Sequence, residues 1–257
     1  MLVEKLFYKT GKLFVRLYAF VAFKIDLVQE GEIPAGPKIF VANHPSTTDP
    51  FLTTILTKDK ICILVKGILF EIPLFGRYLA HAGHIRVIKD EPHLAYQQAK
   101  TKLLAGQSLF LFIEGDISPG KDSYLKPKTG AVRLALETGA PIIPLGFGIH
   151  HSHLKRTCST IGNCPEPGYW YFKGPYAVTI GPSKYIKGSS SDRPYVTKES
   201  QKLLNRVAAL VIHSQQRLAS QSSHLGFFHN LDHLIRVRPL ALRILNQLLL
   251  FLPFLHR

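Results

Sequence analysis

Cysteine is scarce in this chain, which has three cysteines in 257 residues. Cys62, Cys158 and Cys164 form an odd set, and no two of them stand at the spacing usual for zinc ligands. A disulfide framework is therefore not expected, and a reducing compartment is favoured. A chain of this length can bury a hydrophobic core without such cross-links.

Acidic residues are also few, because 17 Asp and Glu stand against 32 Lys and Arg, for a net charge of +15. Such a surplus points to anionic partners, either nucleic acid or an anionic membrane surface. The sequence contains no zinc finger, no RNP-type aromatic motif and no arginine-rich recognition run. Since 46% of the residues are hydrophobic and both chain ends are apolar and basic together, we expect an anionic membrane surface and no nucleic acid.

Long uncharged apolar runs are missing too. The longest run in the N-terminal segment covers residues 17–23, whereas a bilayer span needs ~20 residues. Residues 1–23 predict a basic amphipathic helix, because Lys5, Lys9, Lys12 and Arg16 share one helical face. Charges recur throughout and no cleavage site follows, which disfavours a secretory signal. We favour a helix in the membrane interface; the alternative is a helix packed on its own domain with a solvated basic face.

Three segments are expected: an N-terminal membrane-interface helix over 1–30, a central domain over 31–220, and an apolar, basic tail over 221–257. Within the tail, the apolar stretch 244–255 is interrupted by polar residues and Pro253, so it is too short for a span. It predicts either an interfacial helical tail or a helix that closes the core.

Short apolar strands alternate with helical segments in the central domain. We expect strands at 39–41, 61–65, 82–90, 108–113 and 141–147, and helices at 92–105, 131–138 and 197–218. This alternation predicts an α/β fold with a mixed, mostly parallel sheet flanked by helices. In such sheets the functional residues lie in loops at the carboxyl ends of strands.

The region after these strands is less regular. Residues 148–167 are interpreted as a surface loop, and its histidines and cysteines lack metal-ligand spacing, so no metal is expected. Residues 169–172 and 176–180 flank Lys173-Gly174-Pro175 and predict a hairpin.

The first expected strand runs directly into Asn43-His44-Pro45-Ser46-Thr47-Thr48-Asp49-Pro50. His44 and Asp49 both precede proline, which disfavours helical backbone and favours a turn between them. A turn can bring the carboxylate onto one ring nitrogen of His44, which fixes the tautomer and leaves the other nitrogen to take a proton. The pattern predicts a general base for a hydroxyl group. Asp49 has an alternative role as a helix N-cap followed by Pro50.

Asn43-His44-x-x-x-x-Asp49 resembles the first motif of the glycerolipid acyltransferase family, which includes the glycerol-phosphate and lysophosphatidic acid acyltransferases. Three further blocks stand in that family's order and approximate spacing. They are Gly83-x-Ile85 with Lys89, then Phe112-Ile113-Glu114-Gly115 followed by Lys126 and Gly130-Ala131, and then Ile142-Ile143-Pro144-Leu145. The resemblance covers residues 31–146 and is specific only when the blocks are taken together.

The resemblance implies transfer of a fatty acyl group to a lipid hydroxyl, as a step of lipid synthesis. The donor would be an acyl thioester on coenzyme A or acyl carrier protein, a co-substrate rather than a cofactor. His44 is implied as the general base and Asp49 as the residue that orients it; such a base typically contributes about 10²–10⁴-fold in rate. Ser46 and Ser118 are interpreted as turn residues. The implied location is the cytoplasmic face of a membrane.

The resemblance also implies the acceptor-binding residues, which are Lys66, Gly83, Arg86, Lys89, Glu114 and Gly115. The family binds an acceptor phosphate with an arginine in each of its second and third motifs, but here Lys89 and Ile117 stand at those positions, and Asp116 replaces a threonine. Lysine binds phosphate as a point charge rather than as a planar fork. Arg86 and Lys121 are candidate substitutes.

The resemblance favours a 1-acyl-glycerol-3-phosphate or a related lipid as the acceptor. The departures at Lys89 and Ile117 motivate the alternative, a non-phosphate acceptor such as a glycolipid or an aminolipid. The altered third motif also motivates a hypothesis from another class, a non-catalytic lipid-binding relative. The presence of both His44 and Asp49 argues against that hypothesis.

Overall fold

The computed structural model describes residues 2–120, 123–161 and 163–225. Its strands are β1 (Phe23–Gln29), β2 (Ile39–Ala42), β3 (Ile61–Lys66), β4 (Ile85–Val87), β5 (Ser108–Phe112), β6 (Ile142–Ile149), β7 (Lys155–Ile161), β8 (Cys164–Trp170) and β9 (Gly174–Ile180). Its helices are α1 (Leu2–Ala22), α2 (Asp49–Leu56), α3 (Phe75–His81), α4 (Pro92–Leu104), α5 (Gly130–Thr138) and α6 (Arg193–Leu225), with short 3₁₀ helices η1 (Gly67–Glu71) and η2 (His151–His153).

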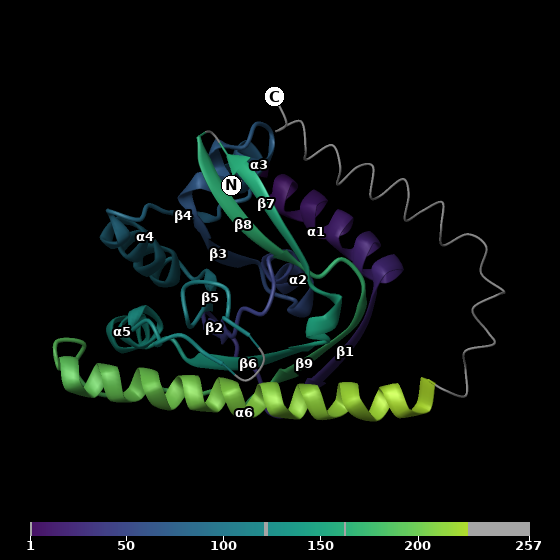
Figure 1. Ribbon diagram of the computed structural model, residues 1–257. Helices are drawn as coiled ribbons and strands as arrows, with labels where there is room; N and C mark the ends of the chain where they lie inside the picture. The colour runs from purple at the N-terminus through teal and green to yellow at the C-terminus, as the bar shows by residue number, and fades with distance from the viewer. Residues whose placement is uncertain (1, 121–122, 162, 226–257) are drawn as a thin grey trace.

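Seven strands form the main sheet in the order β1-β9-β6-β2-β5-β3-β4 (Figure 1). From β6 to β4 every neighbouring pair of strands is parallel. Strand β9 pairs antiparallel with β6, and β1 pairs parallel with β9 at the edge of the sheet. All four residues of β2 are buried, as expected for a central strand covered on both faces. The predicted α/β fold with a mixed, mostly parallel sheet flanked by helices is confirmed.

One face of the sheet is covered by α1 and α2, and the other face by α4, α5 and α6. Leu52 of α2 and Tyr8 of α1 pack with Phe40 and Phe110 in one core cluster. The second cluster joins Val41 to apolar residues of α4, α5 and α6. Helix α6 lies along β6 and β9 (Figure 1). It can approach β6 closely because residue 146 is glycine: a Cβ there would lie 2.2 Å from the Leu210 backbone.

Helix α1 has three distinct faces. Its buried face packs Tyr8, Ala19 and Ala22 against the core. The exposed face is apolar and consists of Val3, Leu6, Leu13, Phe14, Leu17 and Phe20, of which Phe20 is 86% exposed. By helical periodicity, the four basic residues lie between these two faces. The helix therefore packs on its own domain, as the alternative interpretation expects, and it also presents an apolar face to the outside.

The helix ends at Ala22, which agrees with the amphipathic helix predicted for residues 1–23, and the rest of the 1–30 segment is not helical. Residues 23–29 form β1, where the alternation Phe23-Lys24-Ile25-Asp26-Leu27 suits a strand with one covered face. Within the described part of the chain, no helix is both long enough and apolar enough to cross a bilayer.

At the other end, α6 starts at Arg193 and continues to Leu225, so it is longer than the predicted 197–218 helix and passes through the expected boundary at 220. The apolar stretch 244–255 lies outside the described residues.

Residues 176–180 form a strand as predicted, but the loop predicted over 148–167 and the hairpin predicted over 169–180 are wrong. Residues 148–167, predicted as a loop, include β7 and most of β8, which pair with each other as a two-stranded hairpin. The predicted hairpin of 169–172 with 176–180 does not form, because 176–180 belongs to β9 inside the main sheet. Six of the seven β7 residues are exposed, so the strand lacks the apolar alternation that marks a half-buried strand.

Candidate active site

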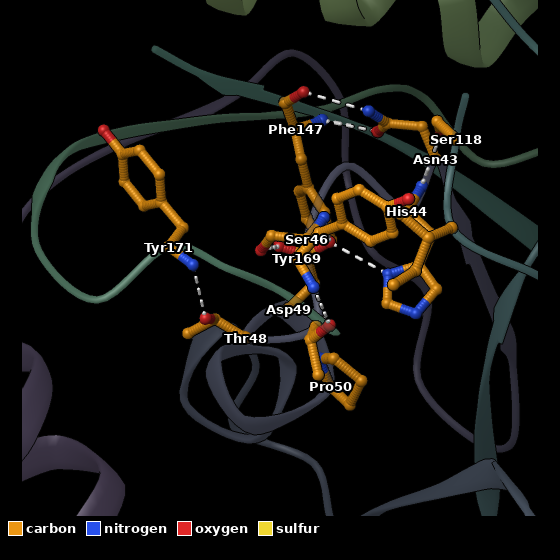
Figure 2. Close-up of polar contacts among 12 residues, drawn as sticks. Asn43, His44, Ser46, Thr48, Asp49, Pro50, Ser118, Phe147, Tyr169 and Tyr171 are labelled. Carbon is orange, nitrogen blue, oxygen red and sulfur yellow. Dashed lines mark hydrogen bonds and ion pairs between the residues drawn. The ribbon is translucent and has the colours of Figure 1, made fainter. Parts of the chain in front are cut away.

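The loop that follows β2 is anchored by Asn43. Its side-chain Nδ2 donates to the Phe147 carbonyl oxygen at 3.0 Å, and its Oδ1 accepts from the Phe147 N–H at 2.8 Å (Figure 2). The amide group thus acts like a peptide group and extends the ladder between β2 and β6 past the Ala42–Leu145 pair. This fixes the point at which His44 leaves the sheet.

His44 and Asp49 meet as the sequence predicts. The His44 Nδ1 lies 3.0 Å from Asp49 Oδ2 (Figure 2). The imidazole also stacks on Phe112, with ring centroids 3.8 Å apart and planes 14° apart. Asp49 has no exposed side-chain surface, whereas His44 keeps 13% of its own exposed. The arrangement leaves Nε2 as the ring nitrogen that can exchange a proton with a ligand.

Asp49 accepts hydrogen bonds on both carboxylate oxygens. The Ser46 N–H donates to Oδ2 at 2.7 Å, and the Ser46 hydroxyl donates to Oδ1 at 2.5 Å. The Tyr176 hydroxyl donates to Oδ1 at 2.8 Å from β9. Together with the imidazole, these groups give two partners to each oxygen. Asp49 is not an N-cap, because Thr48 occupies the cap position of α2 and Asp49 lies in the first turn.

Tyr176 is fully buried beneath this loop. Burial, followed by the neighbouring Asp49 carboxylate, raises the pKa of Tyr176 well above its ordinary value of 10.0. The hydroxyl therefore remains protonated over the working pH range and acts as a donor.

The loop after β5 is joined to the His44 backbone by Ser118. The Ser118 N–H donates to the His44 carbonyl oxygen at 2.8 Å, and its hydroxyl oxygen accepts from the His44 N–H at 3.3 Å (Figure 2). That hydroxyl also donates to Glu114 Oε1 at 2.5 Å, and Leu125 N–H donates to Oε2 at 2.8 Å. Glu114 is 1% exposed and both its oxygens are engaged within the loop.

The base of the β7–β8 hairpin contacts the same loop from another side. Thr47 N–H donates to the Tyr169 carbonyl oxygen at 2.8 Å, and Tyr169 N–H donates to Thr47 Oγ1 at 2.9 Å. The neighbouring Tyr171 N–H donates to Thr48 Oγ1 at 3.0 Å (Figure 2). Every residue between His44 and Asp49 except Pro45 thus contributes a hydrogen bond to the loop or to its surroundings.

The remaining predicted acceptor-site residues lie around β3, β4 and the loops at the carboxyl edge. Lys66 ends β3 and its Nζ lies 2.6 Å from Glu166 Oε2 on the hairpin. Arg86 of β4 pairs with Glu71 of η1. Lys89 is exposed in the turn after β4. In the strand order, β5 lies between the His44 strand β2 and the Lys66 strand β3, and both β5 and β3 lie between β2 and the Arg86 strand β4. Lys121 lies outside the described residues.

The two predicted glycines occupy turns with positive φ. Gly83 has φ +82° in the turn before β4, and Gly115 has φ +71° in the loop after β5. Positive φ favours glycine at both places. A Cβ at Gly115 would also lie 3.0 Å from the Lys128 side chain.

The histidines of residues 150–153 do not assemble a metal site within the described chain. The rings of His150 and His153 lie 5.5 Å apart, but no cluster of three His, Cys, Asp or Glu side chains occurs among the described residues. Burial, together with His153, lowers the pKa of His150.

Five residues of the site were missed by sequence reasoning, namely Ser46, Ser118, Tyr176, Glu71 and Glu166. The two serines carried a usable signal, because hydroxyl residues beside a buried carboxylate in a turn are frequent donors to it. The sequence around Tyr176 and Glu166 gives no such signal. Tyr176 is 127 residues away from Asp49, and Glu166 is 100 residues away from Lys66.

Comparison with known proteins gives a consistent result. Residues 24–148 match the family model named Acyltransferase. A 1-acyl-sn-glycerol-3-phosphate acyltransferase from Cocos nucifera is 34% identical over 137 residues, which covers 51% of this chain and 44% of that protein. A protein of the same name from Helicobacter pylori is 28% identical over 124 residues, covering 47% of this chain and 52% of that protein. The chain thus spans about half the length of the curated relatives it matches.

The fold also has a solved counterpart. The crystal structure of the 1-acyl-sn-glycerophosphate acyltransferase PlsC from Thermotoga maritima superposes with a TM-score of 0.58 at 23% identity, covering 80% of each chain. At that identity the likeness concerns the fold alone. The segment matched by the Acyltransferase family model, residues 24–148, carries both His44 and Asp49 and the strand β2 that precedes them.

Proposed function

We propose that this protein transfers a fatty acyl group from an acyl thioester, carried on coenzyme A or acyl carrier protein, to a lipid hydroxyl. The observation that supports this most directly is the contact between His44 and the buried Asp49, inside a segment that belongs to the acyltransferase family. A histidine held by a carboxylate on Nδ1 suits a general base that acts through Nε2.

In the proposed reaction, His44 Nε2 takes the proton of the acceptor hydroxyl as that oxygen attacks the thioester carbonyl carbon. The resulting intermediate expels the thiolate when the carbon–sulfur bond breaks. His44 then gives its proton to the thiolate sulfur, so that the products are an ester and a free thiol. Asp49 remains ionised throughout and stabilises the imidazolium while it exists. His44 thus ends the reaction in the protonation state in which it began. The reaction needs no reactant besides the acyl thioester and the lipid hydroxyl.

The proposed acceptor is a 1-acyl-glycerol-3-phosphate or a closely related lysophospholipid. The relatives in Cocos nucifera and Helicobacter pylori carry that acceptor in their names. Lys66, Arg86 and Lys89 are proposed as the residues that attract its phosphate, and they lie on the carboxyl side of the sheet, as does His44. Glu114 and Gly115 are proposed to shape the acceptor site through their loop, since Glu114 itself is occupied with hydrogen bonds inside that loop.

A second candidate is a non-phosphate acceptor, such as an aminolipid or a glycolipid. It is favoured by the carboxylates that pair with the proposed phosphate ligands, Glu166 with Lys66 and Glu71 with Arg86. Ile117 adds no cation at the position where the family uses arginine. A headgroup that carries an amine or several hydroxyls can interact with these carboxylates, whereas a phosphate must compete with them.

We also propose that the protein works at the cytoplasmic face of an anionic membrane. The exposed apolar face of α1, with basic residues along one flank, is suited to lie in the headgroup region. Both the acyl donor and the lipid acceptor are available at such a surface.

The proposal can be tested by following thiol release from acyl-CoA and acyl carrier protein with a panel of acceptors. The panel contains 1-acyl-glycerol-3-phosphate, an amino lysolipid and a monoacyl glycolipid, presented in mixed micelles. We expect His44→Gln to reduce acceptor-dependent thiol release by about 10²–10⁴-fold. His93→Gln is the matched control, because His93 is exposed on α4, and it should retain wild-type activity.

The acceptor panel separates the candidates. His44-dependent turnover with 1-acyl-glycerol-3-phosphate supports the first candidate, and turnover confined to the amino or glycolipid acceptor supports the second. If no acceptor gives His44-dependent thiol release while the folded protein still binds lipid micelles, the enzyme proposal is wrong and a non-catalytic lipid-binding relative remains.

A further inference from the structure

We propose that Tyr176 is a positioning residue for His44, because its hydroxyl holds the Asp49 carboxylate and thereby sets how strongly His44 retains a proton. This inference rests on the proposed function, since it concerns the same general base. It adds a residue from β9, a strand that lies beyond the segment 24–148 matched by the family model.

The contact is direct and isolated from water. The Tyr176 hydroxyl lies 2.8 Å from Asp49 Oδ1, and both side chains have no exposed surface. Of the four groups that contact Asp49, His44 and Ser46 belong to the same short loop as the carboxylate. Tyr176 is the one that comes from a distant part of the sequence and ties the loop to the sheet.

The ring of Tyr176 is held in place by neighbouring aromatic side chains. Its centroid lies 5.7 Å from that of Phe147, 6.1 Å from that of Phe23 and 6.2 Å from that of Tyr171. A ring packed in this way keeps its hydroxyl in one place, so the donor is already aimed at Asp49 before any ligand binds. The raised pKa of Tyr176 keeps the proton on that hydroxyl.

The electrostatic consequence has a definite sign. A hydrogen bond to a carboxylate withdraws part of its charge, so the donor weakens the attraction between Asp49 and a protonated imidazole. Removal of the Tyr176 hydroxyl therefore makes His44 hold its proton more strongly. The other titratable groups around this cluster are Tyr171, which adjoins Tyr176, and Glu114, which reaches the His44 backbone through Ser118.

The test is the titration of the His44 ring, followed by NMR of ¹³C- and ¹⁵N-labelled histidine in detergent-solubilised full-length protein. The His44 signal is assigned from its loss in His44→Gln. We expect Tyr176→Phe to raise the midpoint of the His44 titration by about 0.5–1 pH unit. The acid limb of the pH profile of acyl transfer should move upward by the same amount, while KM for the acceptor stays within about 2-fold.

Tyr171→Phe is the matched control. Tyr171 is also fully buried and adjoins Tyr176, but its hydroxyl donates to the Pro175 carbonyl oxygen at 2.8 Å and not to Asp49. We expect that variant to lose a comparable hydrogen bond and leave the His44 midpoint within about 0.2 pH unit of the wild type. A shift of equal size in both variants, or in neither, overturns the inference.

A second probe covers the case in which Tyr176→Phe does not fold. Incorporation of 3-fluorotyrosine at position 176 alone makes the hydroxyl a stronger donor without removing it, and the expected shift of the His44 midpoint is then downward. An unchanged or raised midpoint with this probe refutes the role of Tyr176. Because the ring titration needs no turnover, it also separates this inference from the proposed function, which fails by itself if the wild type shows no His44-dependent thiol release.

Discussion

The loop around His44 and the β3–β4 edge of the sheet, which carries Lys66 and Arg86, differ in how their polar side chains are held in place. Asp49 is completely buried and contacts four groups, all at hydrogen-bonding distance. The Lys66 side chain is 63% exposed, that of Arg86 is 46% exposed, and each pairs with one carboxylate near the surface. The His44–Asp49 pair is thus fixed by a buried network, whereas Lys66 and Arg86 form exposed ion pairs.

This contrast bears on how each region can change. Removing one hydrogen-bond partner of a buried carboxylate lowers the stability of the protein substantially. The polar atoms that remain are then buried without a hydrogen-bond partner and without access to water. Exposed ion pairs contribute only ~0–1 kcal/mol, so residues on the strand edge can be exchanged at little cost in stability. Of the two positions where the resemblance implies an arginine, Lys89 falls in the region where substitution is inexpensive. Ile117 instead lies in the loop after β5, next to Ser118, which contacts the His44 backbone. The His44 loop is therefore the region least tolerant of substitution, and the exposed β3–β4 edge is the more tolerant one.

The largest effect is expected from Asp49→Asn, which disrupts the buried hydrogen-bond network around His44. The amide keeps the shape of the side chain, but it removes the charge and turns an amide N–H₂ toward donors from Ser46 or Tyr176. We expect the rate of thiol release to fall by about 10²–10⁴-fold at every pH. Asp192→Asn is the control, since it removes the same charge at the exposed start of α6. Activity within 3-fold of the wild type for Asp49→Asn would show that the network is not needed.

A second experiment asks whether the strand edge is also anchored by a buried group. His84 precedes β4 and its Nδ1 accepts from the Ile63 N–H of β3 at 3.3 Å. Burial, together with Lys60 and Lys102, lowers the pKa of His84 to about 4 from 6.5. Between those values the unfolded chain binds a proton that the folded protein does not, so stability falls as pH decreases from 6.5 toward 4.

We therefore expect the wild type to lose about 2.5 kcal/mol more unfolding free energy than His84→Gln when the pH is lowered from 7 to 4.5. Urea denaturation at the two pH values measures this difference. His93→Gln should behave like the wild type, because its histidine is exposed. Equal losses in the wild type and His84→Gln would mean that His84 titrates normally and that the edge lacks this anchor.

A third experiment tests whether the exposed apolar face of α1 binds a membrane. Phe20 is 86% exposed on α1, and transfer of one such side chain into an apolar environment is worth about 1.5–3 kcal/mol. We expect Phe20→Ser to reduce partitioning onto vesicles that contain anionic lipid by about 10-fold or more, as measured by co-sedimentation. Leu104→Ser removes a 66%-exposed apolar side chain from α4, on the opposite side of the sheet, and should have no such effect. Similar losses for both variants would contradict a specific role for α1.

The smallest expected effect concerns the Lys66–Glu166 pair. Glu166→Gln frees Lys66, and we expect KM for 1-acyl-glycerol-3-phosphate to fall about 3-fold while unfolding free energy changes by less than about 1 kcal/mol. Glu32→Gln removes an exposed carboxylate elsewhere and serves as the control. An increase in KM would count against a phosphate acceptor and in favour of an aminolipid.

Sequence reasoning recovered the elements whose signals are local. The α/β alternation gave the sheet class, and the spacing of His44, Asp49 and the following prolines gave the turn that joins them. The same reasoning missed β1, because its alternation is short and follows α1 without a break. It also missed the β7–β8 pairing, since most of those residues are exposed and carry no apolar period.

The partners of the predicted site residues were the least predictable part. Glu114 has both oxygens engaged by Ser118 and Leu125, and no local pattern shows that Leu125 folds back to it. Likewise, the approach of Glu166 to Lys66 depends on the direction in which the hairpin leaves β6. Such contacts are set by tertiary packing rather than by spacing along the chain.

The position of β9 in the sheet has a practical consequence for dissecting this protein. Within the described sheet, β1 is joined to the other strands through β9, although the two are separated by most of the chain. A fragment cut after residue 148 would retain β1 but would lack β9. The backbone groups of β1 would then lose their hydrogen-bond partners, and β1 would no longer be part of the sheet. Cutting at the family segment therefore divides a folding unit, and the shortest piece that can close the sheet must continue at least through Ile180.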